Sequence, residues 1–182
     1  FQMEPMNTPL EIEQVRWLAA RPDYVHRSMA RSSRYLFYIV QEVNARNMPT
    51  EIALLPFVES AFVTNAKSSA KAVGLWQFMP ATGKQYKLNI STYVDERHDP
   101  IKSTEAACHY MMNMYAIFGD WSLVLASYNC GPGNVSKAIR RSGGKTDYWE
   151  IRKYLPRETA NYLPAFLATM YIYEYKKEHG LV

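Results

Sequence analysis

The chain has 182 residues, of which 48% are hydrophobic, 14% aromatic and 21% charged, and this length and composition suit a single globular domain. No apolar run approaches the roughly 20 residues that cross a bilayer, and the opening stretch FQMEPMNTPL has neither the basic head nor the apolar core of a signal peptide. The net charge of +4 is spread along the chain, so nucleic acid is not expected as a partner.

Amphipathic helices are predicted in the first quarter of the chain. Apolar residues return at three- and four-residue spacing from Glu11 to about Ala20, and again from about Tyr24 to Arg46. Pro49 ends the second helix, because proline cannot continue the pattern of backbone hydrogen bonds.

The next stretch, LLPFVESAF, places Glu59 among apolar residues. Periodicity leaves residues 51–59 open between a buried helix and a strand, and Pro56 favours a kinked helix with Glu59 near its C-terminal end. Apolar neighbours and a helix C-terminus both disfavour an ionised carboxylate, so we expect a raised pKa for Glu59. A carboxylic acid of this kind suits glycoside cleavage, although a structural glutamate paired with an arginine or with backbone amides fits the same pattern.

A small and polar loop, TNAKSSAKA, precedes the segment GLWQFMPATG, in which Pro80 is placed to begin a short helix. Large apolar residues surround one amide, Gln77, in this segment: Leu75, Trp76, Phe78 and Met79. Flat apolar surface beside a few polar groups is typical of a sugar-binding site. The same stripe is equally compatible with a hydrophobic core.

Four more helices are predicted in the second half: from Pro100 to about Gly119, from Asp120 to about Tyr128, from Val135 to the glycines at 143–144, and from Pro156 to Tyr175. Asp99 and Asp120 are expected N-caps, and Pro100 suits a first helical position. Tyr128 and Asn129 lie at a helix end, where they either face a cleft or simply precede the helix stop. Alternating β-branched runs with hairpin turns are missing, which predicts an all-α fold.

Cysteine and histidine give no sign of a metal site. Cys108 and Cys130 belong to no CxxC pattern, and we expect both to be buried free thiols. The four histidines recur in no ligand spacing, so neither a metal nor a cofactor is expected.

Three segments, in this order, resemble the successive motifs of the SLT-type lytic transglycosylases, which cleave bacterial peptidoglycan: ESAFVTNAKSSAKAVGLWQFMPATG, ASYNCGPGNV and LPRETANYLPAF. The intervening YVDERHDPIKSTEAACHYM is similar to the membrane-bound lytic murein transglycosylase D subgroup of that family. The resemblance runs from about Pro49 to about Tyr173. It implies a lysozyme-like, goose-type helical catalytic domain over residues 49–182, with residues 1–48 as a helical segment packed on it.

The resemblance also implies roles for individual residues. Glu59 would be the single catalytic acid, and Glu158 is expected to be structural first. Residues expected to shape the site or contact sugar are Ser60, Ser68, Gln77, Met79, Tyr128, Asn129 and Tyr162, the last of them near Glu59. The chain departs from the family at Thr64, where proline is common, and at Lys71, where glycine is frequent.

The implied reaction cleaves the bond between N-acetylmuramic acid and N-acetylglucosamine without water. Glu59 would protonate the glycosidic oxygen and then accept the proton of the muramyl C6 hydroxyl, leaving a 1,6-anhydromuramyl end. The expected partner is the peptidoglycan glycan strand, acted on by a monomer. We expect a periplasmic location in the bacterial envelope, with any outer-membrane lipid anchor lying outside this sequence.

Three alternatives remain open from the residues alone: a lysozyme-type hydrolase, a glycan-binding protein without turnover, and a helical interaction domain. A two-carboxylate hydrolase needs a second acid about 5 Å or roughly 6.5–9.5 Å from the first. The acids nearest in type are Asp95, Glu96, Asp99 and Glu105. Nothing in the sequence directs any of them toward Glu59.

Overall fold

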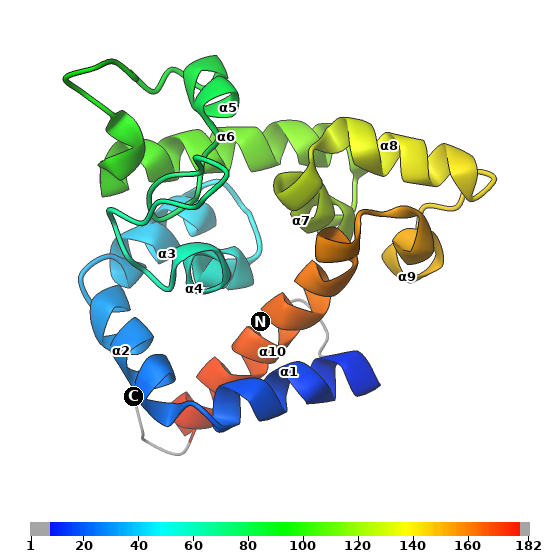
Figure 1. Cartoon of the computed structure of the whole chain (residues 1–182), viewed down its shortest axis with the longest axis horizontal. Coiled ribbons are helices and arrows are strands. Elements are labelled where there is room, and N and C mark those ends of the chain that lie inside the picture. Colours follow the sequence, from blue (N-terminus) through cyan, green and yellow to red (C-terminus); the bar gives the residue numbers. More distant parts are fainter. Residues whose placement is uncertain (1–7, 179–182) are drawn as a thin grey trace. The chain divides into compact units, whose positions relative to one another are not determined.

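The computed structural model describes residues 8–178 and is built from helices, which confirms the all-α prediction (Figure 1). The α-helices are α1 (Pro9–Ala19), α2 (Pro22–Ser32), α3 (Leu36–Ala45), α4 (Leu55–Ser60), α5 (Pro80–Gln85), α6 (Pro100–Phe118), α7 (Trp121–Cys130), α8 (Pro132–Arg141), α9 (Tyr148–Ile151) and α10 (Arg157–Glu178). Short 3-10 helices are η1 (Thr50–Leu54), η2 (Glu96–His98) and η3 (Arg152–Tyr154). Within the described residues, β structure is limited to isolated bridges.

The chain forms two compact units. One comprises the chain up to His109 together with the chain from Phe166 onward, and the other runs from Tyr110 to Ala165. The unit boundaries therefore fall inside α6 and α10. The domain division expected between residues 48 and 49 stays a prediction.

The core of the first unit gathers around α3, η1 and α4. Ile39 and Val43 of α3 are fully buried, as are Ile52 of η1 and Leu55 of α4. Burying such side chains stabilises a fold by about 1.5–3 kcal/mol each. This packing holds the short helix α4 in place, because a helix of its length is not stable alone.

The second unit is built on α7, whose residues 123–127 are buried. Tyr148 of α9 is also buried, and its hydroxyl lies 2.9 Å from the carbonyl oxygens of both Thr159 and Ala160. Burial raises the pKa of Tyr148 to about 12, so the phenol stays protonated and remains a donor. The bond ties α9 to the first turn of α10. The helices α9 and η3, only four and three residues long, were not predicted from the sequence.

One long helix predicted from Tyr24 to Arg46 is instead two helices. α2 ends at Ser32 and α3 begins at Leu36. The hydroxyl of Ser32 donates to the carbonyl of Met29 at 2.6 Å, and Ser33 donates to Ala30 at 2.7 Å. Serine side chains that bond to nearby carbonyls compete with the helix, which accounts for the interruption.

Two predicted helix starts in the second half are confirmed, whereas α8 begins at Pro132, three residues before the expected Val135. Asp99 accepts hydrogen bonds from the backbone N–H groups of Ile101 and Lys102 at the start of α6. Asp120 accepts one from Leu123 at the start of α7. None of the helices within residues 8–178 is both long and apolar enough to cross a membrane.

Candidate active site

Glu59 lies one residue before the end of α4, as predicted, and is half-buried. The 3-10 helix η1 passes into α4 at Leu55, and Pro56 occupies the first turn, where its missing N–H is not needed. Ala61 then adopts a left-handed conformation with φ of 51°, which stops the helix. Beside the same end, Arg31 of α2 donates to the carbonyl of Ala61 at 2.9 Å. The raised pKa expected for Glu59 stays a prediction.

Ser60 connects this helix to the loop that follows. Its hydroxyl donates to the carbonyl of Leu75 at 2.8 Å. Leu75 is itself buried, so the bond joins the helix that carries Glu59 to a fixed point of the loop. The sequence had suggested only that Ser60 would shape the site.

The loop of residues 66–79 consists of two tight turns. Antiparallel bridges pair Lys67 with Val73 and Val73 with Phe78. The first turn, residues 68–71, closes through a bond from the N–H of Lys71 to the carbonyl of Ser68 at 3.1 Å. The second turn, residues 74–77, closes through a bond from Gln77 to Gly74 at 3.2 Å.

Lys71 and Gln77 both have positive φ, of 68° and 52°. Non-glycine residues adopt such conformations at a cost of about 1–3 kcal/mol, and they gather at functional sites. The position of Lys71 is one where glycine would carry no strain. The positive φ is a physical reason for the glycine that the family resemblance implied at this position, and Lys71 carries the strain instead.

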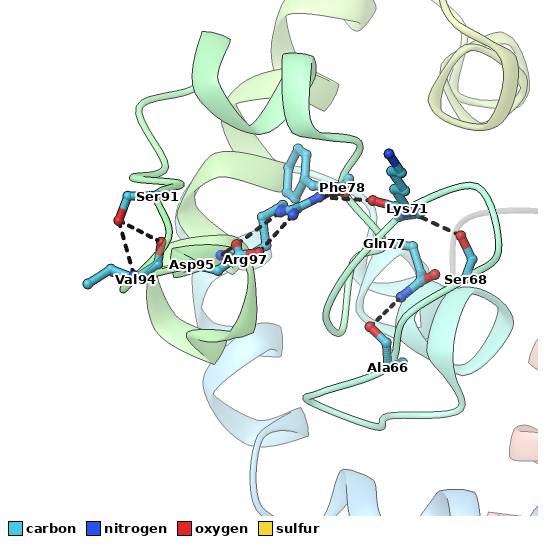
Figure 2. A network of polar contacts seen from close by, with 10 residues as sticks. Ala66, Ser68, Lys71, Gln77, Phe78, Ser91, Val94, Asp95 and Arg97 are labelled. Atoms are coloured by element: carbon cyan, nitrogen blue, oxygen red, sulfur yellow. Dashed lines mark hydrogen bonds and ion pairs between the residues drawn. The ribbon is translucent and has the colours of Figure 1, made fainter.

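Gln77 has its amide orientation set by the loop. Its nitrogen Nε2 donates to the carbonyl of Gly74 at 2.8 Å. The same nitrogen donates to the carbonyl of Ala66 at 3.3 Å (Figure 2). Since carbonyls only accept, the NH₂ end must face them. The oxygen Oε1 of Gln77 has no hydrogen-bond donor among the described residues, so it is an open acceptor.

Ser68 and Met79 are exposed at either end of the loop. The oxygen Oγ of Ser68 accepts a bond from the N–H of Ala72 at 3.0 Å. The hydroxyl proton of Ser68 therefore remains to be donated. Met79 is 44% exposed and immediately precedes α5.

The apolar platform suggested for the GLWQFMP segment is wrong for three of its four residues. Leu75, Trp76 and Phe78 are at most 3% exposed and belong to the core. The indole nitrogen of Trp76 donates to the hydroxyl of Thr104 in α6 at 3.0 Å. These three buried side chains anchor the loop in the core. Met79 is the one residue of the expected platform that lies at the surface.

Tyr128 and Asn129 lie near the end of α7, in the second unit. Oδ1 of Asn129 accepts a bond from the hydroxyl of Thr159 at 2.7 Å, and Nδ2 donates to Glu158 at 3.3 Å. The ring of Tyr128 lies 5.7 Å from that of Tyr110, measured between centroids. Asn129 thus connects the end of α7 to the start of α10.

Tyr162 is buried in α10, at 7% exposure, and belongs to the second unit. Glu59, Ser60, Ser68, Gln77 and Met79 all belong to the first unit. The structure thus gathers the expected residues into two groups. The approach of Tyr162 to Glu59 stays a prediction.

The acids of the DERHD segment are engaged elsewhere in the structure. Asp95 pairs with Arg97 at 2.7 Å, and the Arg97 guanidinium lowers the pKa of that carboxyl. Glu96 pairs with Lys102, whose hydrogen bond lowers the pKa of the glutamate. Asp99 caps α6. Arg97 was not among the predicted site residues, because no local pattern indicates which distant backbone an arginine reaches.

Metal-binding side chains do not cluster within residues 8–178: no group of three or more His, Cys, Asp or Glu could hold an ion there, and His179 lies outside these residues. Both cysteines are free, as predicted; Cys108 is buried, whereas Cys130 is half-buried. Burial raises the pKa of Cys108 to about 11, which leaves the thiol protonated and inert.

The sequence of this chain is similar to several known proteins. It is 39% identical over 97% of its length to membrane-bound lytic murein transglycosylase D of Escherichia coli (strain K12), and spans only 39% of that relative. The soluble lytic murein transglycosylase of the same strain is 30% identical over 64% of the chain, which covers 19% of it. A putative tributyltin chloride resistance protein of Alteromonas sp. (strain M-1) is 44% identical over 65% of the chain and 58% of its own length.

Solved structures share the fold. Lytic transglycosylase Slt of Pseudomonas aeruginosa, solved as an inactive mutant, matches 77% of this chain and 24% of its own, with a TM-score of 0.62 and 25% identity. The 70 kDa soluble lytic transglycosylase of Escherichia coli matches 91% of this chain and 30% of its own, with a TM-score of 0.67 and 22% identity. The family model of the transglycosylase SLT domain matches residues 37–151. With well over half of its length covered by that model, this chain belongs to the transglycosylase SLT domain family.

Proposed function

We propose that this chain is the catalytic part of a peptidoglycan lytic transglycosylase. The observation that carries the proposal is the placement of Glu59 at the end of α4, bonded through Ser60 to a loop that offers Ser68 and Gln77 to a ligand. Two relatives are named lytic murein transglycosylases. The bond we propose to be cleaved is the β-1,4 bond between N-acetylmuramic acid and N-acetylglucosamine.

Glu59 acts twice in the proposed reaction. As an acid it gives its proton to the glycosidic oxygen, so that the bond from this oxygen to C1 of the muramyl sugar breaks. The acetamide oxygen of the same sugar forms a bond to C1 and spreads the developing positive charge. Glu59, now a carboxylate, takes the proton of the C6 hydroxyl, whose oxygen displaces the acetamide oxygen at C1. The product is a 1,6-anhydromuramyl end, and the carboxylic acid is restored.

Gln77 and Ser68 are assigned to holding the muramyl acetamide and ring. Gln77 offers an acceptor, Oε1, suited to an amide N–H or a sugar hydroxyl. Ser68 offers a hydroxyl proton. Fixing the substrate in this way favours the intramolecular C6 hydroxyl over water, because a positioned group has a very large effective concentration. We assign Met79, Tyr128, Asn129 and Tyr162 to the walls of the substrate site, and Glu158 to support of Asn129.

A single carboxylate is favoured by the state of three of the four other candidate acids. Asp95 and Glu96 are ion-paired, and Asp99 is used as a helix cap. In addition, the Pseudomonas structure is of an inactive mutant with one glutamate changed to glutamine, so one such change suffices to inactivate that enzyme. We further propose that the chain acts as a monomer in the bacterial envelope, where the named relatives are membrane-bound or soluble.

The test is mass spectrometry of the fragments released from purified peptidoglycan by the wild-type protein and by Glu59→Gln. The proposal expects fragments about 18 Da lighter than the products of hydrolysis, because the C6 hydroxyl replaces water as the nucleophile. The variant should release none. Free reducing ends would identify a hydrolase instead, and release by the variant would exclude Glu59 as the acid.

A further inference from the structure

Arg97 is a buried arginine beside the loop of residues 66–79, with only 7% of its side chain exposed. We propose that Arg97, oriented by Asp95, is a positioning residue that holds this loop in the shape required to present Ser68 and Gln77 to the glycan. The inference rests on the proposed function, since it concerns the same substrate. It assigns a role to two residues that the motifs of the family resemblance did not single out.

The guanidinium of Arg97 joins the two turns of the loop. Its nitrogen Nη1 donates to the carbonyl of Lys71 at 3.0 Å and to the carbonyl of Phe78 at 3.0 Å (Figure 2). Lys71 ends the first turn, and Phe78 directly follows the second. A single nitrogen therefore fixes the distance between the parts of the loop that carry Ser68 and Gln77.

Asp95 sets the direction of this guanidinium. Its Oδ1 accepts from Nε of Arg97 at 2.9 Å, and its Oδ2 accepts from Nη2 at 2.7 Å. Such a two-point pair locks the plane of the arginine. Lysine at this position has one nitrogen and no fork, so it cannot reach both carboxylate oxygens and both loop carbonyls at once.

The loop is also packed tightly against the backbone of Arg97. A Cβ atom added at Gly74 would lie 1.9 Å from the carbonyl oxygen of Arg97, so only glycine fits. A Cβ at Gly83, in α5, would lie 3.4 Å from Cδ of Arg97. The arginine thus contacts both the loop and the helix that follows it.

Backbone strain in the loop explains why a side chain that holds the loop in shape is needed. Lys71 and Gln77 have φ of 68° and 52°, values that non-glycine residues avoid when nothing holds them. The carbonyl of Lys71, one of these two residues, is a direct acceptor of Arg97. Without the guanidinium, the first turn is free to relax, and the acceptor Oε1 of Gln77 loses its fixed direction.

The test compares three variants with the wild type on soluble peptidoglycan strands: Arg97→Lys, Asp95→Asn and, as a matched control, Lys102→Ala. The control breaks the ion pair with Glu96 in the same segment and leaves the loop untouched. We expect Arg97→Lys to lower kcat by about 10- to 100-fold, because small misplacements of positioned groups have effects of this size. KM should change much less, and the control should match the wild type.

A double variant separates positioning from general destabilisation. If Arg97 acts through Gln77, then Arg97→Lys combined with Gln77→Ala should lose little more activity than Arg97→Lys alone, whereas independent effects would multiply. Asp95→Asn keeps the arginine and supports the same comparison should Arg97→Lys not fold. Wild-type values of kcat and KM for a folded Arg97→Lys or Asp95→Asn, or multiplied losses in the double variant, would overturn the inference. No turnover by the wild type would overturn the proposed function itself.

Discussion

Two regions of the molecule carry expected site residues, and they use amide side chains in opposite ways. In the loop of residues 66–79, only the side-chain nitrogen of Gln77 forms hydrogen bonds with the protein, and the side-chain oxygen forms none. At the end of α7, Asn129 uses its oxygen for Thr159 and its nitrogen for Glu158. The motif resemblance assigned both to the substrate site. Their hydrogen bonds leave an open acceptor on Gln77, whereas both polar atoms of Asn129 are engaged within the protein. We therefore expect Asn129, even at the wall of the proposed substrate site, to contribute mainly to stability.

The largest expected effect comes from breaking the loop itself. Gly74→Ala places a methyl group 1.9 Å from the carbonyl oxygen of Arg97, at a φ of 88° that alanine disfavours. We expect a loss of about 2–5 kcal/mol in the free energy of unfolding, from overpacking and backbone strain together. Denaturant unfolding measures this loss. Gly133→Ala is the control, because a Cβ there meets no neighbour within 4 Å, and equal stability of both variants would contradict the packing described.

Asn129→Ala should affect stability more than catalysis. The hydroxyl of Thr159, which is 1% exposed, would lose its acceptor, and an unsatisfied buried polar group costs about 1–3 kcal/mol. Thermal unfolding should show a clear drop. Thr159→Val removes the other partner and should be no more harmful when combined with Asn129→Ala than either change alone. A strictly additive pair would contradict the assigned bond.

Gln77→Ala should show the opposite balance. The carbonyls of Gly74 and Ala66 each keep a backbone donor, from Gln77 and Gly74 respectively, so little stability is lost. Loss of the acceptor Oε1 should reduce kcat/KM about tenfold, the value of one good hydrogen bond in the transition state. Steady-state kinetics beside thermal unfolding measures both. A variant that is unstable but fully active per folded molecule would make Gln77 a brace like Asn129.

The smallest expected effect concerns pH. Asp95 has its pKa lowered from 3.8 by the bond to Arg97, so its pairing stabilises the folded state above the unfolded pKa. That contribution is lost as the pH falls through the lower, folded pKa. The free energy of unfolding, measured from neutral to acid pH, should therefore fall more steeply for the wild type than for Asp95→Asn. Parallel curves would show that the pair contributes nothing measurable.

Features that depend on near neighbours in sequence were predicted well. The start of α6 at Pro100 and of α7 after Asp120 follows from capping residues that act within three positions. The place of Glu59 near the end of α4 follows from Pro56 and the apolar run around it. Local chemistry marks where these helices begin or end, although the short helix α4 also needs the packing around it to form.

Features set by distant contacts were missed. The partner carbonyls of Arg97 lie 26 and 19 residues away, and no local pattern points to them. The sequence could not decide whether the GLWQFMP segment belongs to the core or forms a sugar-binding surface, because burial depends on which distant residues cover it. Trp76 is buried in the core and bonded to Thr104 of α6. The break between α2 and α3 after Ser32 was also not predicted. The hydrogen bond from the Ser32 side chain to its own helix does not change the spacing of apolar residues.

The most direct test of the proposed mechanism is the reaction in water enriched in heavy oxygen, followed by mass spectrometry of the muramyl ends. In the proposed reaction the C6 hydroxyl attacks C1, and Glu59 only moves protons. The proposed mechanism predicts that the wild-type fragments carry no heavy oxygen from the solvent. Glu59→Gln should release no fragments. Heavy oxygen at the new reducing ends of the wild-type products would contradict it and show that water is the nucleophile.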